Sequence, residues 1–287
     1  MADPVLRSLT LPAPAKINHF LHITGRRADG YHLLQTAFEF LDYADQLELT
    51  VRDDGVISRS SGPAEIPPAE DLVVRAATLL QKETAGQFGA DISVRKKIPM
   101  GGGLGGGSSD AATVLLGLNE LWGAGLDISA LASLGLRLGA DVPVFVQGHA
   151  AWAEGVGEQL TFIDLPSCWY LVLHPGVHVS TAEIFLNGGL TRNCQPSKIA
   201  TSFTGSMRNV FEPVVRKMCS EVDDAFHWLS QYAVTKMTGS GACLFAGFDT
   251  QQQALAVLGE MPKQWTGFVA KSESISPLHQ KLGLTVN

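Results

Sequence analysis

One run of residues limits what this chain can fold into more than any other feature. Residues 101–107 hold six glycines in seven positions, interrupted only by Leu104, and Ser108 and Ser109 then precede a helical pattern over 110–122. Glycine adopts positive φ angles at little cost, so such a run can turn several backbone N–H groups toward one concave surface. The N-terminus of a helix capped by Ser108 or Ser109 adds further N–H groups and the positive end of its dipole. The pattern predicts a loop that binds phosphate, and the alternative is a flexible linker.

This loop differs from the three best-known nucleotide-binding loops. Gly101, Gly103 and Gly106 match the dinucleotide-binding spacing, but Pro99 precedes them and no acidic residue ends a strand about 20 residues later. No lysine directly follows the last glycine, as a P-loop requires, and the lysine and aspartate motifs of protein kinases are absent. The run therefore indicates a phosphate loop from another kinase architecture.

Composition narrows the class of protein. With 45% hydrophobic and 17% charged residues, the 287-residue chain can bury a large core, and its formal charge of −7 disfavours general binding of nucleic acid. No apolar run reaches the ~18 residues of a membrane span, and residues 1–10 lack the pattern of a secretion signal. The four cysteines have no zinc-site spacing, which favours free thiols in a reducing compartment. We therefore expect a cytoplasmic protein with neither nucleic-acid nor membrane partners, and its oligomeric state is left open.

The apolar pattern predicts an α+β protein. Residues 16–24 and 46–52 read as strands, and 53–55 (Asp-Asp-Gly) mark a hairpin turn. Asp71 is placed to cap a helix whose apolar positions begin at Leu72. The composition changes near 161–166, where we expect a boundary between two lobes.

Three segments resemble the three motifs of the GHMP small-molecule kinases. They are residues 14–18 (Pro-Ala-Lys-Ile-Asn), 99–111 and 237–242 (Met-Thr-Gly-Ser-Gly-Ala). The resemblance implies an N-terminal ATP-binding lobe over 1–162, similar to domain 2 of ribosomal protein S5. It also implies a ferredoxin-like C-terminal lobe over 163–287, with the active site between the lobes.

Three further segments narrow the resemblance within that family. Residues 24–32, 138–147 and 151–157 are similar to members that act on a cytidine-diphosphate-linked sugar alcohol. The resemblance implies transfer of phosphate from ATP, with Mg²⁺, to the 2-hydroxyl of 4-diphosphocytidyl-2-C-methyl-D-erythritol, in non-mevalonate isoprenoid precursor biosynthesis. One alternative is a family member acting on mevalonate, homoserine or a sugar, which the 24–32 segment disfavours. Another is a non-catalytic nucleotide- or RNA-binding module, which the acidic charge disfavours.

Two charged residues are the catalytic candidates. The resemblance implies that Asp141 is the base that takes the proton of the acceptor hydroxyl. Asp141 precedes Val142 and Pro143, however, and this order also suits a helix N-cap. Lys16 lies within a predicted strand, where an unpaired charge is costly to bury, so we expect a partner such as Asp141. The alternative for Lys16 is a side chain that extends to water.

The remaining candidates are binding residues. The predicted nucleotide-binding residues are Lys96, Pro99, Met100, Gly101, Gly102, Gly103, Leu104, Gly105, Gly106, Gly107, Ser108 and Ser109. The predicted substrate-binding residues are Asn18, Tyr31, His32, Phe185, Thr238, Gly239, Ser240 and Gly241. Among these, Tyr31 and Phe185 are candidates to stack on a cytosine and His32 to read its edge, while 238–241 is either a second phosphate turn or an ordinary hairpin turn. No magnesium ligand is identified.

Overall fold

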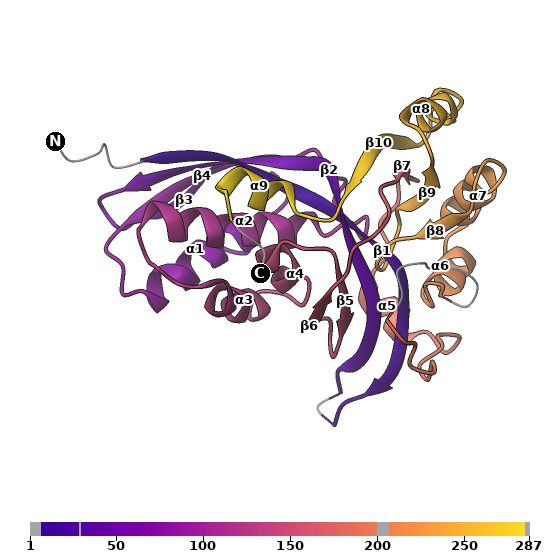
Figure 1. The fold of residues 1–287 in the computed structure, drawn as a ribbon, viewed down its shortest axis with the longest axis horizontal. Helices are drawn as coiled ribbons and strands as arrows, with labels where there is room; N and C mark the ends of the chain where they lie inside the picture. The colour runs from indigo at the N-terminus through magenta and orange to yellow at the C-terminus, as the bar shows by residue number, and fades with distance from the viewer. Residues whose placement is uncertain (1–6, 29, 200–206, 285–287) are drawn as a thin grey trace.

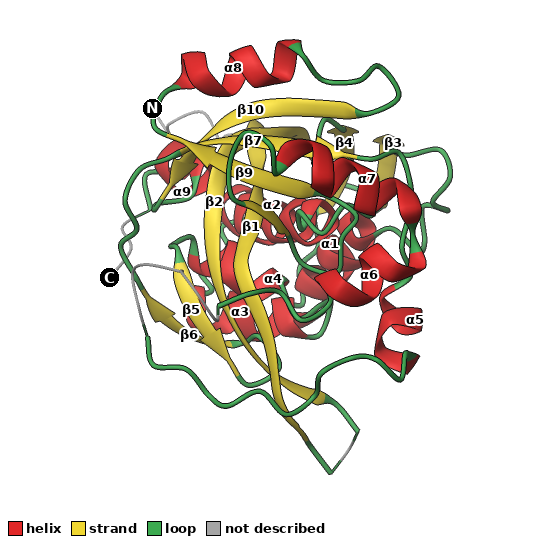
Figure 2. Ribbon diagram, turned by 90° about the vertical axis from the view of Figure 1, so that its right-hand side faces the viewer, coloured by secondary structure: helices red, strands yellow, loops and turns green. Residues whose placement is uncertain are grey.

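Two long paired strands organise the fold. In the computed structural model, which describes residues 7–28, 30–199 and 207–284, β1 (Ser8–Arg26) and β2 (His32–Arg52) pair antiparallel along most of their length. They run from the upper part of the molecule down to a protruding hairpin tip (Figure 2). Register shifts interrupt the pairing at three places in β1, including Pro14/Lys16. Such irregularities let a strand bend, so the predicted strand at 16–24 is part of one longer, curved strand.

The first half of the chain forms a sheet covered on one face by helices (Figure 1). After β2 come β3 (Ile57–Ser61), α1 (Leu72–Glu83), β4 (Gly89–Arg95), α2 (Gly106–Leu121), α3 (Ile128–Leu136), α4 (Val142–Gln147), β5 (Ala151–Glu154) and β6 (Gln159–Phe162). Leu47 of β2, Leu115 of α2 and Phe145 of α4 belong to the core between the sheet and the helices.

The hairpin predicted at 53–55 is wrong. The chain does turn there, but β3 pairs in parallel with β4, and β4 lies between β3 and β2. Parallel strands need a crossover, and α1 supplies it while burying Val73, Ala76 and Leu80. The local turn signal therefore did not determine which strand β3 joins.

The second half adds more strands and helices. It contains β7 (Trp169–His174), α5 (Thr181–Leu186), α6 (Glu212–Met218), α7 (Ser220–Leu229), β8 (Thr235–Met237), β9 (Leu244–Phe248), α8 (Gln251–Gly259), β10 (Thr266–Glu273) and α9 (Pro277–Leu282). The strand order continues from β2 through β10, β7, β9 and β8. The predicted α+β class is confirmed.

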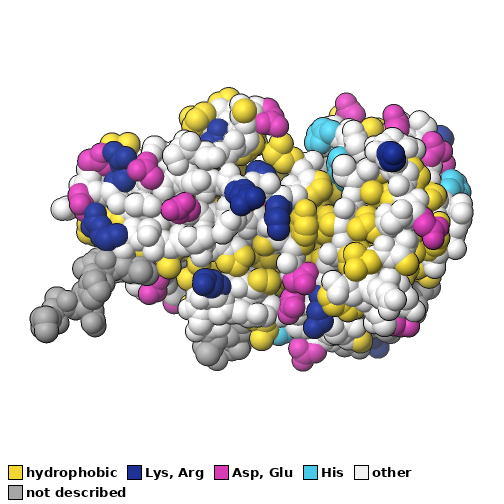
Figure 3. Space-filling view, turned by 90° about the horizontal axis from the view of Figure 1, so that it is seen from above, with side chains coloured by type: hydrophobic (Ala, Val, Ile, Leu, Met, Phe, Trp, Pro, Cys, Tyr) yellow, Lys and Arg dark blue, Asp and Glu magenta, His cyan; other side chains and the backbone are white. Residues whose placement is uncertain are grey.

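The boundary between the lobes stays a prediction. Helix α9 returns to the first half, where Leu278 packs in the same core as Leu115. Seen from above, apolar side chains gather near the waist between the two halves (Figure 3). In the described part of the chain, no helix is long and apolar enough to cross a membrane.

Two predicted helix starts had different outcomes. Asp71 caps α1 as predicted, because its side chain accepts a hydrogen bond from the Val73 N–H. Helix α2 begins at Gly106 with Gly105 as its N-cap, so neither Ser108 nor Ser109 caps it. Gly105 has φ +73°, and this left-handed residue turns the chain into the helix earlier than a serine cap would.

Candidate active site

The glycine run forms a fixed loop and is not a flexible linker. Gly101, Gly103 and Gly105 have φ angles of +68°, +76° and +73°, a region that favours glycine. The loop is held by its own carbonyls, because Gly102 O accepts from Cys243 N at 3.1 Å and Leu104 O accepts from Lys16 N at 3.0 Å. These donors come from opposite halves of the chain. The loop is therefore fastened where the halves meet.

This loop lines a pocket of about 340 Å³. All the predicted nucleotide-binding residues from Pro99 to Ser108 line it, and so does Lys96. Ser109 is not among the lining residues; it is fully buried, and its hydroxyl makes no hydrogen bond to any described residue. Pro63, Ile66 and Leu72 add an apolar part to the pocket. These three lie in a loop and at a helix start that carry no recognisable motif.

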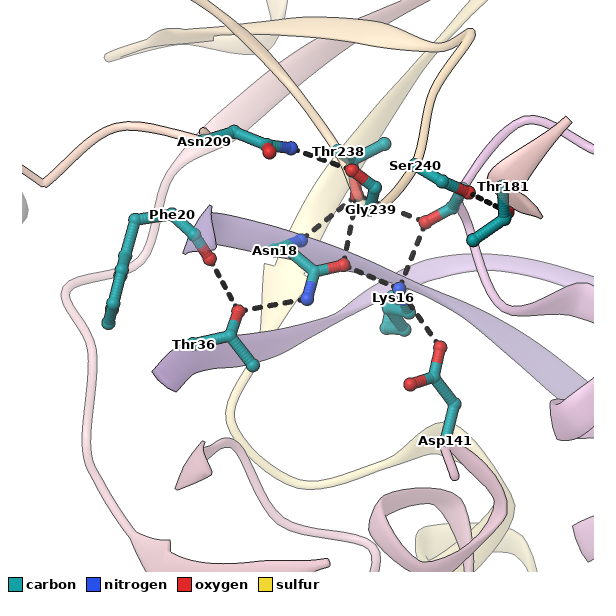
Figure 4. A network of polar contacts seen from close by, with 11 residues as sticks. Lys16, Asn18, Phe20, Thr36, Asp141, Thr181, Asn209, Thr238, Gly239 and Ser240 are labelled. Carbon is teal, nitrogen blue, oxygen red and sulfur yellow. Dashed lines mark hydrogen bonds and ion pairs between the residues drawn. The ribbon is translucent and has the colours of Figure 1, made fainter. Parts of the chain in front are cut away.

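Lys16 and Asp141 form an ion pair beside this loop (Figure 4). Lys16 Nζ lies 3.3 Å from Asp141 Oδ2, and the Lys16 side chain is 3% exposed against 37% for Asp141. The expectation that Lys16 has a partner is therefore confirmed. Asp141 occupies the N-cap position of α4, but its side chain makes no capping hydrogen bond. Its carboxylate is thus free to act on a group other than the helix.

Further bonds fix the direction of the Lys16 ammonium. It donates to Asn18 Oδ1 at 2.5 Å and to Gly103 O at 2.9 Å. Asn18 in turn donates from Nδ2 to Thr36 Oγ1 at 2.9 Å and from its backbone N–H to Thr238 Oγ1 at 3.0 Å. Asn18 is 2% exposed and both ends of its amide are engaged within the protein. In this conformation Asn18 orients Lys16. A direct contact between Asn18 and substrate stays a prediction.

The second glycine turn lies against the first. Residues 238–241 connect β8 to β9, which pair antiparallel, so they form the turn of a hairpin, and phosphate binding by this turn stays a prediction. Thr238 Oγ1 donates to Gly103 O at 3.1 Å, and a Cβ on Gly103 would lie only 2.2 Å from Thr238 O. Thr238 is fully buried, whereas Ser240 is partly exposed. The turn therefore meets the glycine loop through Thr238; Gly239 and Gly241 are buried as well, and Ser240 is partly exposed.

Two residues without a sequence motif hold this second turn. Asn209, 3% exposed, donates from Nδ2 to Met237 O at 2.9 Å and to Gly239 O at 2.7 Å. Thr181 Oγ1 donates to Ser240 Oγ at 2.8 Å (Figure 4). Both lie in or near loops far from the turn in sequence, so no local pattern marks them.

Tyr31, His32 and Phe185 line a second pocket, of about 530 Å³. The Phe185 ring stacks on the His32 ring, with centroids 4.7 Å apart and 14° between the planes. Tyr31 is 67% exposed. Burial, with the nearby charges of Arg26 and Arg192, lowers the pKa of His32. A neutral imidazole has one donor and one acceptor, the pair of groups that a base edge requires.

The ion pair adjoins one lining residue of each pocket. Gly103, whose carbonyl binds Lys16, lines the glycine-lined pocket. Ala140, the residue before Asp141, lines the aromatic pocket. A group held in one pocket can thus approach a group held in the other beside a carboxylate and an ammonium. This arrangement suits transfer between two bound molecules, with proton removal by the carboxylate.

A second charged cluster lies under the glycine loop. Lys96 Nζ donates to Asp45 Oδ2 and, at 2.7 Å, to Asp110 Oδ2. Burial alone would lower the pKa of Lys96, but the two carboxylates outweigh it and raise that pKa. Burial raises the pKa of Asp110 to about 7, although Lys96 opposes the rise. Lys96 is therefore already paired before any nucleotide enters.

Comparison with known proteins agrees with this geometry. Residues 71–149 match the model of the GHMP kinases N terminal domain, and 195–267 match that of the GHMP kinases C terminal domain. Two proteins named 4-diphosphocytidyl-2-C-methyl-D-erythritol kinase, from Alkalilimnicola ehrlichii and Nitrosococcus oceani, are 58% and 57% identical to the chain. Each alignment covers 94% of this chain, with 93% of the first relative and 96% of the second.

A solved structure extends the likeness to three dimensions. The crystal structure of a 4-(cytidine 5'-diphospho)-2C-methyl-D-erythritol kinase is 30% identical, with a TM-score of 0.79 over 92% of this chain and 99% of that one. The fold, both family models and the close relatives agree. The chain belongs to the GHMP kinases.

Proposed function

We propose that the protein transfers the γ-phosphoryl group of ATP to the 2-hydroxyl of 4-diphosphocytidyl-2-C-methyl-D-erythritol, a step of non-mevalonate isoprenoid precursor biosynthesis. The observation that carries the proposal is the Lys16–Asp141 pair, which adjoins a lining residue of the glycine-lined pocket and one of the aromatic pocket. The names of the relatives at 58% and 57% identity support the choice of substrate.

Asp141 is the proposed base. As the substrate hydroxyl oxygen bonds to the γ-phosphorus, the bond from phosphorus to the β–γ bridging oxygen breaks and ADP leaves with that electron pair. The hydroxyl proton passes to the Asp141 carboxylate. Lys16 orients that carboxylate and offsets the charge that develops on the transferring group. Gly103 and Asn18 hold the ammonium in place for this role.

ATP occupies the glycine-lined pocket in this proposal. The N–H groups of residues 101–107 and the start of α2 face the triphosphate, since both features favour anions. Pro63, Ile66 and Leu72 offer the apolar surface that a purine requires. We place the boundary between the lobes at 162/163, with this pocket in the first lobe, although α9 packs against the first half.

The cytidine end of the substrate occupies the aromatic pocket. His32 now covers one face of Phe185, so a cytosine that stacks on that face must displace the His32 ring. Neutral His32 can then read the base edge, and Tyr31 supplies a second aromatic face. The N–H groups of Gly239 and Ser240 are proposed to face the substrate diphosphate, because positive φ angles such as those of Gly239 and Gly241 are typical of anion-binding turns. The Gly241 N–H already donates to Thr238 O at 2.9 Å.

Mg²⁺ accompanies ATP, because phosphoryl transfer requires neutralised phosphate oxygens. The described residues contain no cluster of three or more His, Cys, Asp or Glu side chains that could hold a metal ion alone. In sites that bind nucleotide phosphates, Mg²⁺ is generally held by one or two carboxylates together with phosphate oxygens and water. The cysteines described are all free thiols, which supports a cytoplasmic location.

The test is incubation with ATP, Mg²⁺ and candidate acceptors, followed by mass spectrometry. The proposal predicts a monophosphorylated cytidyl product and ADP, with mevalonate and homoserine left unmodified. Efficient phosphorylation of an acceptor without cytosine would overturn the substrate assignment. No phosphorylated product from any acceptor would overturn the kinase proposal itself.

A further inference from the structure

The Asp110 carboxylate is only partly hydrogen-bonded to the described residues. Its side chain is 7% exposed, lines the glycine-rich pocket and accepts from Lys96 through Oδ2. The other oxygen, Oδ1, is buried without a hydrogen-bond partner among the described residues. A buried carboxylate oxygen that lacks a donor or a cation is costly, so it indicates a ligand that arrives later.

The charges around Asp110 do not balance. Among the described residues, Lys96 is the single cation bonded to both Asp45 and Asp110, so one positive charge faces two negative ones. Asp45 is also held by the N–H groups of Lys97 and Ile98, and its side chain has no exposed surface. Asp45 therefore has its charge well compensated, and the excess negative charge falls on Asp110, within the pocket that must accept a triphosphate.

A triphosphate and an ionised carboxylate repel each other in one pocket unless a cation lies between them. Lys96 is committed to two carboxylates and cannot fill that role alone. Carboxylate and phosphate oxygens are the ligands that Mg²⁺ prefers.

We propose that the Asp110 carboxylate is a protein ligand of the Mg²⁺ that enters with ATP. The inference rests on the proposed function, since it assumes that the glycine-lined pocket takes ATP. It assigns Lys96 a positioning role: the Lys96 ammonium holds Oδ2 and so fixes the carboxylate that meets the metal. Ser109, whose buried hydroxyl also lacks a partner, does not line the pocket and is not assigned to the metal.

The test is calorimetric titration with adenosine 5'-(β,γ-imido)triphosphate, a non-hydrolysable analogue, with Mg²⁺ or with EDTA. In the wild type, Mg²⁺ should tighten binding of the analogue by about tenfold or more, which corresponds to about 1.4 kcal/mol. Asp110→Asn keeps the shape of the side chain but not its charge, so in this variant the gain in affinity from Mg²⁺ should shrink to about twofold or less. The matched control is Asp164→Asn, because the Asp164 side chain is 94% exposed and lines no part of this pocket.

A second measurement does not depend on any variant folding. Wild-type protein labelled with ¹³C at its aspartate carboxyl groups is mixed with the analogue and Mn²⁺ in place of Mg²⁺. Electron–nuclear double resonance should then show an aspartate carboxyl carbon strongly coupled to the manganese. The same Mg²⁺ gain in Asp110→Asn as in the wild type, or no aspartate coupling, would overturn the inference. Failure of the analogue to bind the wild type at all would overturn the proposed function as well.

Discussion

Replacing Gly103 by alanine should damage the site more than any other single methyl group added to the loop. Gly103 has φ +76°, and an added Cβ would lie 2.2 Å from Thr238 O and 3.2 Å from Gly241 N. Both contacts are to backbone atoms, which cannot rotate away as a side chain can. The Gly103 carbonyl also accepts from Lys16 and Thr238, so any shift of residue 103 moves the ammonium of the proposed catalytic pair.

The expected loss of stability in Gly103→Ala is the sum of two free-energy costs. A left-handed backbone costs a residue with a Cβ about 1–2 kcal/mol. Overpacking against atoms that must shift adds about 1–3 kcal/mol. We therefore expect Gly103→Ala to lower the free energy of unfolding by about 2–5 kcal/mol. If the strain is relieved by moving the loop, affinity for the ATP analogue should fall by about tenfold or more, since 1.4 kcal/mol corresponds to tenfold.

Gly107→Ala is the matched control. Gly107 lies in the same run but within α2, without a positive φ, and its added Cβ would meet nothing nearer than Leu72 Cδ1 at 3.6 Å. Alanine favours a helix over glycine, so this variant should be as stable as the wild type or more so. The assays are urea denaturation and calorimetric titration with the analogue. Equal stability and equal affinity for the two variants would refute the close approach of the two glycine turns.

Three other variants test separate parts of the site. Tyr31→Ala should raise the KM for the cytidyl substrate about tenfold, since stacking on a base is worth ~1–3 kcal/mol, and should change the KM for ATP by less than about twofold in an ADP-release assay; equal cytidyl KM values would contradict the aromatic pocket. Asn209→Ala should cost about 1–3 kcal/mol in urea denaturation, because two buried carbonyls lose their donor; unchanged stability would mean that the turn is held otherwise. The pKa of Asp110 is raised on folding from 3.8 to about 7, so its contribution to stability is fully present below pH 3.8 and is lost as the pH rises through about 7. As the pH rises from 5 to 8, the free energy of unfolding should therefore fall less in Asp110→Asn than in the wild type. Equal falls for the two proteins in urea denaturation would contradict the raised pKa.

Features with a local cause could be predicted from the sequence. The glycine run predicted a loop with positive φ angles because such angles are favoured by glycine itself, and Asp71 was recognisable as a cap from the helix that follows it. The partner of Lys16 was predictable for a different reason. A lysine in a buried strand needs a counter-charge wherever in the chain that charge lies.

Features that depend on distant backbone groups could not be predicted. Asn209 binds two carbonyls of a turn that follows much later in the chain, and carbonyls carry no sequence signal. The insertion of β4 between β2 and β3 depends on the crossover through α1, which the turn at 53–55 does not reveal. The two carboxylates that share Lys96 come from β2 and α2, so their coupling is visible only in three dimensions.

The central claim is that Asp141 acts as the base and is not merely a residue at a helix start. The most direct test is a rapid-quench experiment on the wild type and on Asp141→Asn. It measures the single-turnover rate at which the γ-phosphoryl group passes from ATP to the cytidyl substrate. The rate should fall by about 10²–10⁴ in the variant, while calorimetric affinity for the ATP analogue stays within about twofold of the wild type. A folded Asp141→Asn protein that transfers phosphate within a few-fold of the wild-type rate would contradict the account.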